Sequence, residues 1–486
     1  MNEFNQFVFI GTPFPIYTIL GYQTKDNTIP TDVQTSHPVM KNELVIPATV
    51  MDDRKMWNPL PLVSKILVFL GRPIPGEIKI RYLIMTVSSI IMFSQSFLFL
   101  VMRFSDLKSR LLAFEDMVIL FYISAILIDF ALKPNKVLTI MATIKRRHFN
   151  LKEVISADQK AVLDNLERKA QRTTKLLIIT VTCYPLANFI LPISSGVITL
   201  LTKNKGGSID AGNHTSKWHD SVYNEKSNNE FEDYPLPVES WYPFSIARMP
   251  IYLTLCLIQG TYLCVEGMIF ACWIVLILCA FLTVEMELKF LCQSFREIDF
   301  RVEKYMMDQK TVAADDNLND LKNNFLRIYL RNLVEHHQSI IEVVNELNRA
   351  SSFLVFMFNQ IISCQICMSL FGSQVDDKVL KLKYRILAIP ILFSFGMFCY
   401  YGQGIGNEDE EMRKAVLHCS WERKPLWFKK DLLLILTRLN KPLEIKPLGL
   451  YVLNLRNFAV IINASYSYYN LLHTTELKNR AAEFSN

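Results

Sequence analysis

The longest apolar stretch of the chain is residues 249–284, MPIYLTLCLIQGTYLCVEGMIFACWIVLILCAFLTV, which holds one charged side chain, Glu266. About 20 apolar residues in a helix cross the roughly 30 Å hydrocarbon layer of a membrane, so this stretch is longer than one crossing requires. Two crossings joined at Glu266 are the alternative. Gly267 is the only turn-forming residue beside Glu266, which favours one helix that continues past the bilayer.

Six further stretches have the length and composition of membrane spans. They are residues 82–102, 117–132, 176–202, 350–375, 386–407 and 457–475. Hydrophobic residues make up 51% of the chain and charged residues only 20%, which excludes general disorder. The net charge of +6 is too small and too dispersed for a nucleic-acid-binding block. The sequence therefore predicts an all-α membrane protein with seven transmembrane helices.

The distribution of Lys and Arg beside these spans predicts the orientation. With a cytoplasmic N-terminus, inside segments hold 36 Lys and Arg residues and outside segments hold 14. Because basic residues concentrate on the cytoplasmic side, the N-terminus is predicted to be cytoplasmic and the C-terminus extracellular. The triplet Asn213-His214-Thr215 then lies on the outside as a predicted glycosylation site.

This orientation predicts seven consecutive regions. They are a cytoplasmic N-terminal region at 1–80; spans 1–4 at 81–288 with an extracellular loop at 203–248; cytoplasmic helices at 289–349; spans 5–6 at 350–407; a cytoplasmic anchor helix at 408–446; span 7 at 447–475; and an extracellular tail at 476–486.

Chemistry-bearing motifs are scarce. The sequence has no P-loop, no G-x-S-x-G and no H-E-x-x-H, so we predict neither an enzyme nor a cofactor. Cys364 and Cys367 stand within a span without a second pair, and no metal site is predicted. His336 and His337 are adjacent and are expected on a cytoplasmic helix surface. Glu266, at membrane depth, suits a functional group and a hydrogen-bonded packing group equally well.

The predicted cytoplasmic segments have the pattern of amphipathic helices. Apolar residues recur at helical spacing within 289–349, and the acidic run at 408–411 is expected to begin a helix that ends at Asn440. Such helices require an apolar partner, and we favour contact with another subunit. A G-protein-coupled receptor has the opposite orientation and usually a disulfide to its second outer loop, whereas residues 203–248 contain no Cys.

The last span, 457–475, is unusually polar. Ser467, Asn470, Leu471 and Thr474 share one helical face. Lipid penalises such polar groups, so they must face protein or water. Polar rings beside an apolar ring suit a gated pore shared by several subunits. Hydrogen bonding of these polar groups within a compact monomer explains the pattern equally well.

Several motifs, read together, carry a resemblance to a known family. In chain order they are Trp241-Tyr242-Pro243-Phe244, Pro250, Tyr252 and Gln259; Val334-Glu335-His336-His337-Gln338 and Ile341; then Trp421, Lys430-Asp431-Leu432-Leu433-Leu434, Arg438, Lys441-Pro442-Leu443, Gly449-Leu450-Tyr451, Phe458 and Ser465-Tyr466-Ser467-Tyr468. From about residue 57 to 475 the chain resembles the insect odorant receptor family, and residues 468–473 resemble its odorant-tuning subunits rather than its co-receptor.

The resemblance implies a ligand-gated, non-selective cation channel of four subunits in the plasma membrane, formed with a co-receptor and serving olfaction in the dendrite of a sensory neuron. It implies that span 7 of each subunit lines the pore, with Leu471 as the apolar gate and Thr474 in the adjacent polar ring. A taste-type receptor of the same architecture, a G-protein-coupled receptor and a seven-span enzyme or transporter are the alternatives.

The resemblance also implies a binding region for a small volatile in the outer halves of spans two, three, four and six. The residues in that region are Val118, Phe121, Tyr122, Asn188, Leu191, Tyr252, Cys256, Gln259, Met397 and Tyr400, each of which also suits ordinary packing. An apolar pocket with one hydrogen-bonding group, such as Asn188 or Gln259, suits an ester, an alcohol or an aldehyde.

Overall fold

The computed structural model describes residues 60–72, 76–102, 107–145, 236–238, 240–244, 249–310, 318–372 and 378–485, with positions 161, 164–165, 167–169, 171–176 and 178–179. The chain divides into two units, Met1–Pro47 and Ala48–Asn486. The first unit lies outside the described residues, and every described residue belongs to the second.

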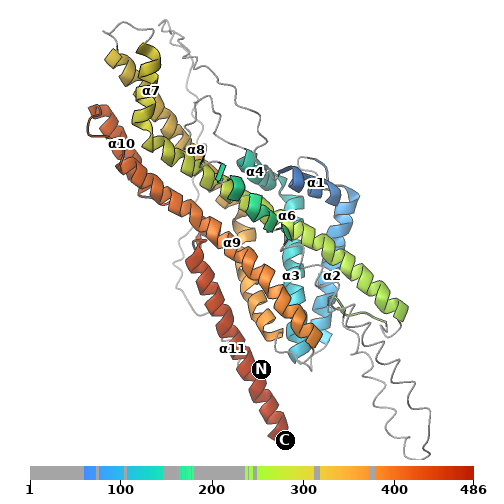
Figure 1. Cartoon of the computed structure of the whole chain (residues 1–486). Helices are drawn as coiled ribbons and strands as arrows, with labels where there is room; N and C mark the ends of the chain where they lie inside the picture. Colours follow the sequence, from blue (N-terminus) through green and yellow to red (C-terminus); the bar gives the residue numbers. More distant parts are fainter. Residues whose placement is uncertain are drawn as a thin grey trace, which may run out of the picture. The chain divides into compact units, whose positions relative to one another are not determined.

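Helices make up almost all of the described chain (Figure 1). They are α1 (Leu60–Leu70), α2 (Ile80–Met102), α3 (Leu107–Leu132), α4 (Pro134–Lys145), α6 (Met249–Arg296), α7 (Ile298–Lys310), α8 (Leu318–Gly372), α9 (Lys378–Leu417), α10 (Leu426–Leu439) and α11 (Leu455–Ser485), with a short 3-10 turn, η4 (Pro447–Gly449). Within these residues there is no strand.

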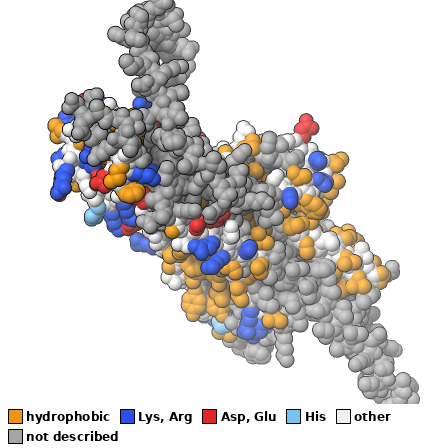
Figure 2. Space-filling model, turned by 45° about the horizontal axis from the view of Figure 1, so that its top comes forward, with side chains coloured by type: hydrophobic (Ala, Val, Ile, Leu, Met, Phe, Trp, Pro, Cys, Tyr) orange, Lys and Arg blue, Asp and Glu red, His pale blue; other side chains and the backbone are white. Residues whose placement is uncertain are grey.

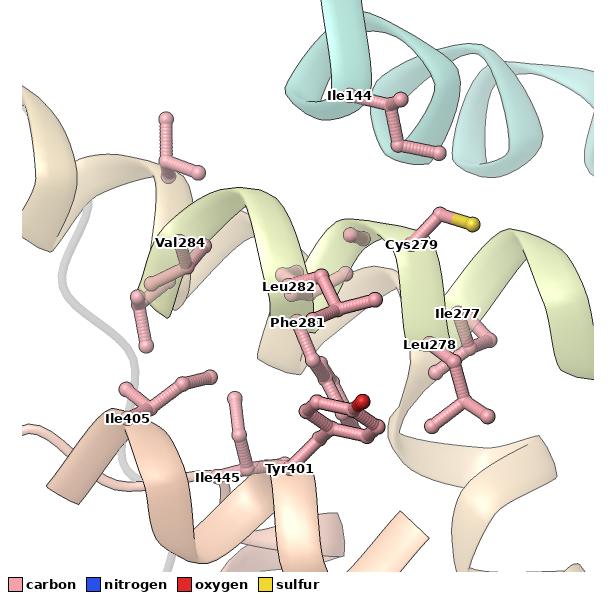
Figure 3. Close-up of a cluster of buried hydrophobic side chains, with 14 of the residues drawn as sticks. Ile144, Ile277, Leu278, Cys279, Phe281, Leu282, Val284, Tyr401, Ile405 and Ile445 are labelled. Atoms are coloured by element: carbon pink, nitrogen blue, oxygen red, sulfur yellow. The ribbon is translucent and has the colours of Figure 1, made fainter. Parts of the chain in front are cut away.

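Helix α6 is the centre of the core. Residues 271–288 are buried all round the helix, as expected for a helix surrounded by others. Helices α1, α3, α4, α8 and α9 pack against it. Figure 3 shows buried side chains gathered around α6, with Ile144 of α4 on one side and Tyr401 of α9 on the other. The prediction of one continuous helix through Glu266 is confirmed.

A sharp bend separates α3 from α4. Helix α3 ends at Leu132, and α4 begins at Pro134 after a change of direction of 88°. Proline cannot continue the preceding helix, because it lacks an N–H and its ring clashes with the previous turn, but it suits the first position of a new one. Asp129, buried in α3, pairs across this bend with Lys133 at 3.6 Å.

Helix α2 presents a long apolar face outward. Its exposed large hydrophobic residues are Ile80, Leu83, Ile84, Val87, Ile90, Ile91, Phe97, Leu98, Val101 and Met102. Figure 2 shows hydrophobic side chains in broad patches over the face in view. Such contiguous apolar surface would be unfavourable in water and suits lipid. Four described helices are long and apolar enough to cross a membrane, or five if the bent pair α3–α4 is one span.

The predicted spans agree with these helices. Six of the seven lie on α2, α3, α6, α8, α9 and α11, and nearly all of the remaining one, 176–202, lies outside the described residues. The all-α membrane fold is therefore confirmed. Helix α11 is not among the described helices that are long and apolar enough to cross a membrane, which agrees with its polar sequence.

The predicted helix start at the acidic run 408–411 is wrong. Helix α9 passes through this run without interruption and ends at Leu417, and α10 begins only at Leu426. Two of the acidic residues instead bind basic partners on α6: Lys289 lies 3.3 Å from Glu408, and Arg296 lies 3.1 Å from Glu411. Asn440 caps the end of α10 as predicted.

Helix α10 and the segment after it form a bridge between α9 and α11. Phe428, Leu432, Ile435 and Leu439 of α10 are buried on one face, and α10 packs against α9. Beyond α10, Asp409 accepts a hydrogen bond from the Leu443 N–H at 2.9 Å. Asn348 of α8 accepts one from the Lys446 N–H at 3.1 Å. The segment that leads to α11 is thus tied to both α8 and α9.

The predicted exposed position of His336 and His337 is wrong. His336 lies 2.8 Å from Glu287 of α6, and His337 is buried. Burial, with the nearby charges of Arg438 and His336, lowers the pKa of His337 to about 4. The side chain is therefore neutral at physiological pH.

This burial predicts an acid-sensitive stability. An unfolded histidine has a pKa of about 6.5, so the unfolded chain binds a proton more readily than the folded one. The contribution of neutral His337 is complete above pH 6.5 and decreases as pH falls from about 6.5 toward 4, by up to ~3 kcal/mol. Melting of the purified protein at pH 7.5 and 5.0 should show a smaller acid loss in His337→Gln, whereas exposed His418→Gln should match wild type. An equal acid loss in all three proteins would contradict this account.

Candidate functional site

A small internal cavity lies between four helices. It has a volume of about 70 Å³, and its walls are mostly apolar. The lining residues are Ile119, Tyr122 and Ile123 of α3; Leu263, Glu266, Gly267 and Phe270 of α6; Phe358, Ile361, Ile362 and Gln365 of α8; and Pro390 and Ser394 of α9. Their three- and four-residue spacing on each helix directs one face of each toward the cavity.

Aromatic side chains close one side of the cavity. Tyr122 and Phe358 line it and stack with ring centroids 5.9 Å apart. Trp273, one turn below Phe270 on α6, meets Tyr122 edge-on at 5.6 Å and Phe358 at 5.4 Å. The Tyr122 hydroxyl donates to the Leu354 carbonyl at 3.1 Å, so its polar end is satisfied by α8. These contacts hold the rings in place and leave an apolar wall.

Two buried polar side chains interrupt that apolar wall. Oε1 of Glu266 accepts hydrogen bonds from the Tyr262 hydroxyl and, at 3.3 Å, from the Ser89 hydroxyl of α2. On α8, the Gln365 amide donates to Oε1 of Glu115, which also accepts from Ser369 at 3.4 Å. These networks tie α2, α3, α6 and α8 together around the cavity.

Helix α11 has an inner face that packs on the bundle. Asn457 donates to Asn359 of α8 at 2.8 Å. Ser465 is fully buried and donates to the Ser363 carbonyl at 3.1 Å. Phe458 meets Phe395 of α9 at a centroid distance of 5.6 Å. Hydrogen bonding within the protomer therefore explains part of the polar character of this helix.

The opposite face of α11 is exposed. Ser467, Asn470, Leu471 and Thr474 all lie on it, and Leu471 is 57% exposed. The hydroxyls of Ser467 and Thr474 donate to the carbonyls four residues earlier, at 2.9 and 2.7 Å. The predicted pore residues thus share an outward surface away from α8 and α9, the helices that α11 contacts.

The structure separates the predicted ligand-binding residues. Tyr122 alone among those that it describes lines the cavity, whereas Phe121, on the next position of α3, lies in an open groove beside α2. Val118 is half-buried, Met397 packs against the main core, and Tyr400 is exposed. Asn188, Leu191 and the predicted glycosylation site Asn213 lie outside the described residues.

The predicted residues at the start of α6 serve the adjoining outer segment. Tyr252 and Cys256 form a small buried cluster with Leu236. Gln259 accepts a hydrogen bond from the Val238 N–H at 3.1 Å and donates to the Tyr242 hydroxyl at 3.0 Å. These three side chains therefore hold residues 236–238 and 240–242 against α6.

Sequence reasoning missed most of the cavity wall. Gln365, Phe358 and the α8 isoleucines were not selected, because the resemblance implied spans two, three, four and six. A usable signal was present in Glu266 and Gln365, which are polar groups within apolar spans. Among the described residues, no three His, Cys, Asp or Glu side chains are placed to hold a metal ion.

The fold and the cavity define a multi-pass, all-α membrane protein with a small, mostly apolar cavity between its helices. The family model described as 7tm Odorant receptor matches residues 144–466, and the chain belongs to that family. The family is one of receptors, not of enzymes.

Individual insect receptors are also similar to this chain. Odorant receptor 10 of Aedes albopictus is 28% identical over 161 residues, which cover 32% of this chain and 42% of that receptor. The chain thus spans less than half the length of this curated relative. The solved insect olfactory receptor OR5 of Machilis hrabei has a TM-score of 0.64 at 12% identity, covering 85% of this chain and 97% of that one. The structure of OR5 in complex with eugenol has a TM-score of 0.61 at 12% identity, covering 86% of this chain and 97% of that one. The likeness shows a common fold.

Proposed function

We propose that this chain is the odorant-binding subunit of a ligand-gated, non-selective cation channel. Four subunits, including an odorant co-receptor, surround one pore, and α11 of each contributes its exposed face. A small volatile binds within the helical bundle and favours the open state. The predicted setting is the plasma membrane of a sensory neuron dendrite, with the cytoplasmic N-terminus, extracellular C-terminus and glycosylated Asn213 that the sequence predicts.

The outward face of α11 carries this proposal. Asn470 and Ser467 are exposed on a helix whose other side is already packed on α8 and α9. In lipid, exposed amides and hydroxyls would be costly, so this face requires either water or another subunit. A ring of such helices supplies water-lined polar positions, and exposed Leu471 supplies the apolar constriction that dewets when closed.

The exposed face of helix α10 supports the proposed assembly of several subunits. Leu433 and Leu434 are 65% and 69% exposed on the face opposite its buried stripe, and Leu426 is 68% exposed. Three exposed leucines on one short helix favour burial against a neighbour. The predicted cytoplasmic anchor therefore offers an apolar surface for contact between subunits.

Packed rings connect the cavity with α11. Phe358, which lines the cavity, meets Phe395 of α9 at 6.2 Å, next to the lining residue Ser394. Phe395 in turn meets Phe458 of α11 at 5.6 Å. A ligand that shifts α9 relative to α8 would move α11, provided that it binds the open state more tightly than the closed state.

The receptor OR5 was solved with eugenol, which shows that this fold accommodates a small ligand in that protein. In this chain we assign the volatile to the cavity beside Tyr122 and Glu266. The predicted residues Val118, Phe121, Asn188, Leu191, Met397 and Tyr400 remain a proposed outer part of the same region.

Expression in oocytes with and without a co-receptor tests this function. We expect a panel of volatiles to evoke cation currents within milliseconds, only with the co-receptor and without added nucleotides. Currents that require a G protein, or an N-terminal tag that antibodies reach on intact cells, would point to a coupled receptor. Responses confined to involatile water-soluble tastants would instead favour the taste-type alternative.

A further inference from the structure

The two polar side chains in the cavity wall each retain an oxygen atom without a hydrogen bond. A carboxyl buried in an apolar wall favours its neutral form, so Oε2 of Glu266 carries the proton and can donate, whereas Oε1 of Gln365 can only accept. Glu266 is 1% exposed and Gln365 is 2% exposed. Among the described residues, neither Oε2 of Glu266 nor Oε1 of Gln365 has a hydrogen-bond partner. Buried polar atoms are almost always paired, so these two atoms on one cavity point to a ligand that donates to Gln365 and accepts from Glu266.

The surrounding contacts fix which atoms remain available. Oε1 of Glu266 already accepts from Tyr262 and Ser89, so Oε2 is the oxygen left over. The Gln365 amide nitrogen donates to Glu115. Reversing this amide would set its carbonyl oxygen against the oxygen of Glu115, so the orientation with Oε1 left over is the favoured one.

The remaining wall limits the ligand. Apart from these two groups and Ser394, the described lining residues present hydrocarbon, aromatic rings or glycine, and none is Lys or Arg. A volume of about 70 Å³ is well below the roughly 300–1,000 Å³ of sites for drug-sized molecules. The chamber therefore suits a compact, uncharged, mostly hydrocarbon molecule.

We propose that the cavity selects volatiles with a hydroxyl donor, namely short-chain alcohols, over ethers and other molecules that only accept hydrogen bonds. The hydroxyl donates to Oε1 of Gln365 and accepts from the Glu266 carboxyl, and the hydrocarbon part packs against Tyr122 and Phe358. This inference rests on the proposed odorant-binding function and narrows its ligand class.

Isomeric ligand pairs test the proposal in the receptor co-expressed with its co-receptor. Ethanol and dimethyl ether share one formula, as do propan-1-ol and ethyl methyl ether, but only the alcohols donate a hydrogen bond. We expect each alcohol to activate at about tenfold lower concentration than its ether, the ratio that one hydrogen bond of roughly 1.4 kcal/mol sets.

Variants locate the effect. Gln365→Met removes the acceptor, whereas Glu266→Gln replaces the Oε2 hydroxyl with an amide NH2 group that also donates. Gln365→Met should therefore abolish the alcohol preference, and Glu266→Gln should retain it. Glu335→Gln, the same change at an exposed position paired with Arg331, should leave the ratio unchanged. A preference that survives Gln365→Met, with normal surface expression, would refute the proposal.

Thermal melting of the purified complex with the same four ligands separates this inference from the proposed function. Alcohol-selective stabilisation without any current would sustain the ligand class and reject the channel. Currents in which ethers match alcohols would sustain the channel and reject the ligand class. If no ligand produces either a current or a melting shift, both are rejected.

Discussion

Replacing Leu471 with Ala is expected to raise the resting conductance of the assembled channel. Leu471 lies exposed on the outward face of α11 between Asn470 and Thr474, where its counterparts would close the pore. A smaller side chain widens the apolar constriction and allows water in the closed state. Each ~1.4 kcal/mol lost by the closed state raises the small open fraction by about tenfold. Voltage-clamp recording without odorant measures this effect.

Leu472→Ala is the matched control. It changes the same residue type one position along α11, but Leu472 is half-buried and about 100° further round the helix. Resting current should stay at the wild-type level in this variant. If both substitutions, or neither, alter the resting current, Leu471 is not the gate.

Gly402→Ala is expected to damage the connection between α9 and α11. A Cβ at Gly402 would meet the backbone carbonyl oxygen of Leu453, just before α11, and lie 3.1 Å from the Leu453 Cγ. Because a backbone atom is the obstacle, the segment must shift as a unit. Overpacking of this kind costs about 1–3 kcal/mol. We expect a lower melting temperature and a marked loss of odorant-evoked current.

Gly406→Ala, one turn further along α9, is the control for this prediction. Its nearest neighbour would be the Leu443 carbonyl oxygen at 3.8 Å, an ordinary contact. Alanine is favoured over glycine inside a helix by about 1 kcal/mol, so this variant should be as stable as wild type or slightly more so. Equal losses in both variants would show that the close approach at Leu453 is not responsible.

The spans could be predicted because their signal is local. Apolar length alone identifies α2 and α6, and the spacing of Ser467, Asn470, Leu471 and Thr474 places them on one face of α11. That face could turn inward or outward, since polarity alone is satisfied by packing or by water. The packing of Asn457 and Ser465 on α8 decides which face of α11 turns inward, and only the folded structure reveals this packing.

The cavity and some helix ends could not be predicted. The acidic run at 408–411 favours a helix start by its charge, but pairs such as Lys289–Glu408 stabilise it inside α9. Gln365 becomes part of the cavity wall because α3 and α6 meet α8 there. The spacing of residues along one helix gives no information about such contacts between helices.

Cysteine accessibility along α11 tests the central claim most directly. The nine described native cysteines are buried or half-buried, so background reaction should be small. We expect a charged, water-soluble thiol reagent, applied during odorant stimulation, to block current in Asn470→Cys and Thr474→Cys but not in Leu472→Cys. Modification of Leu472→Cys with no effect on Asn470→Cys would show that the outward face of α11 does not line the pore.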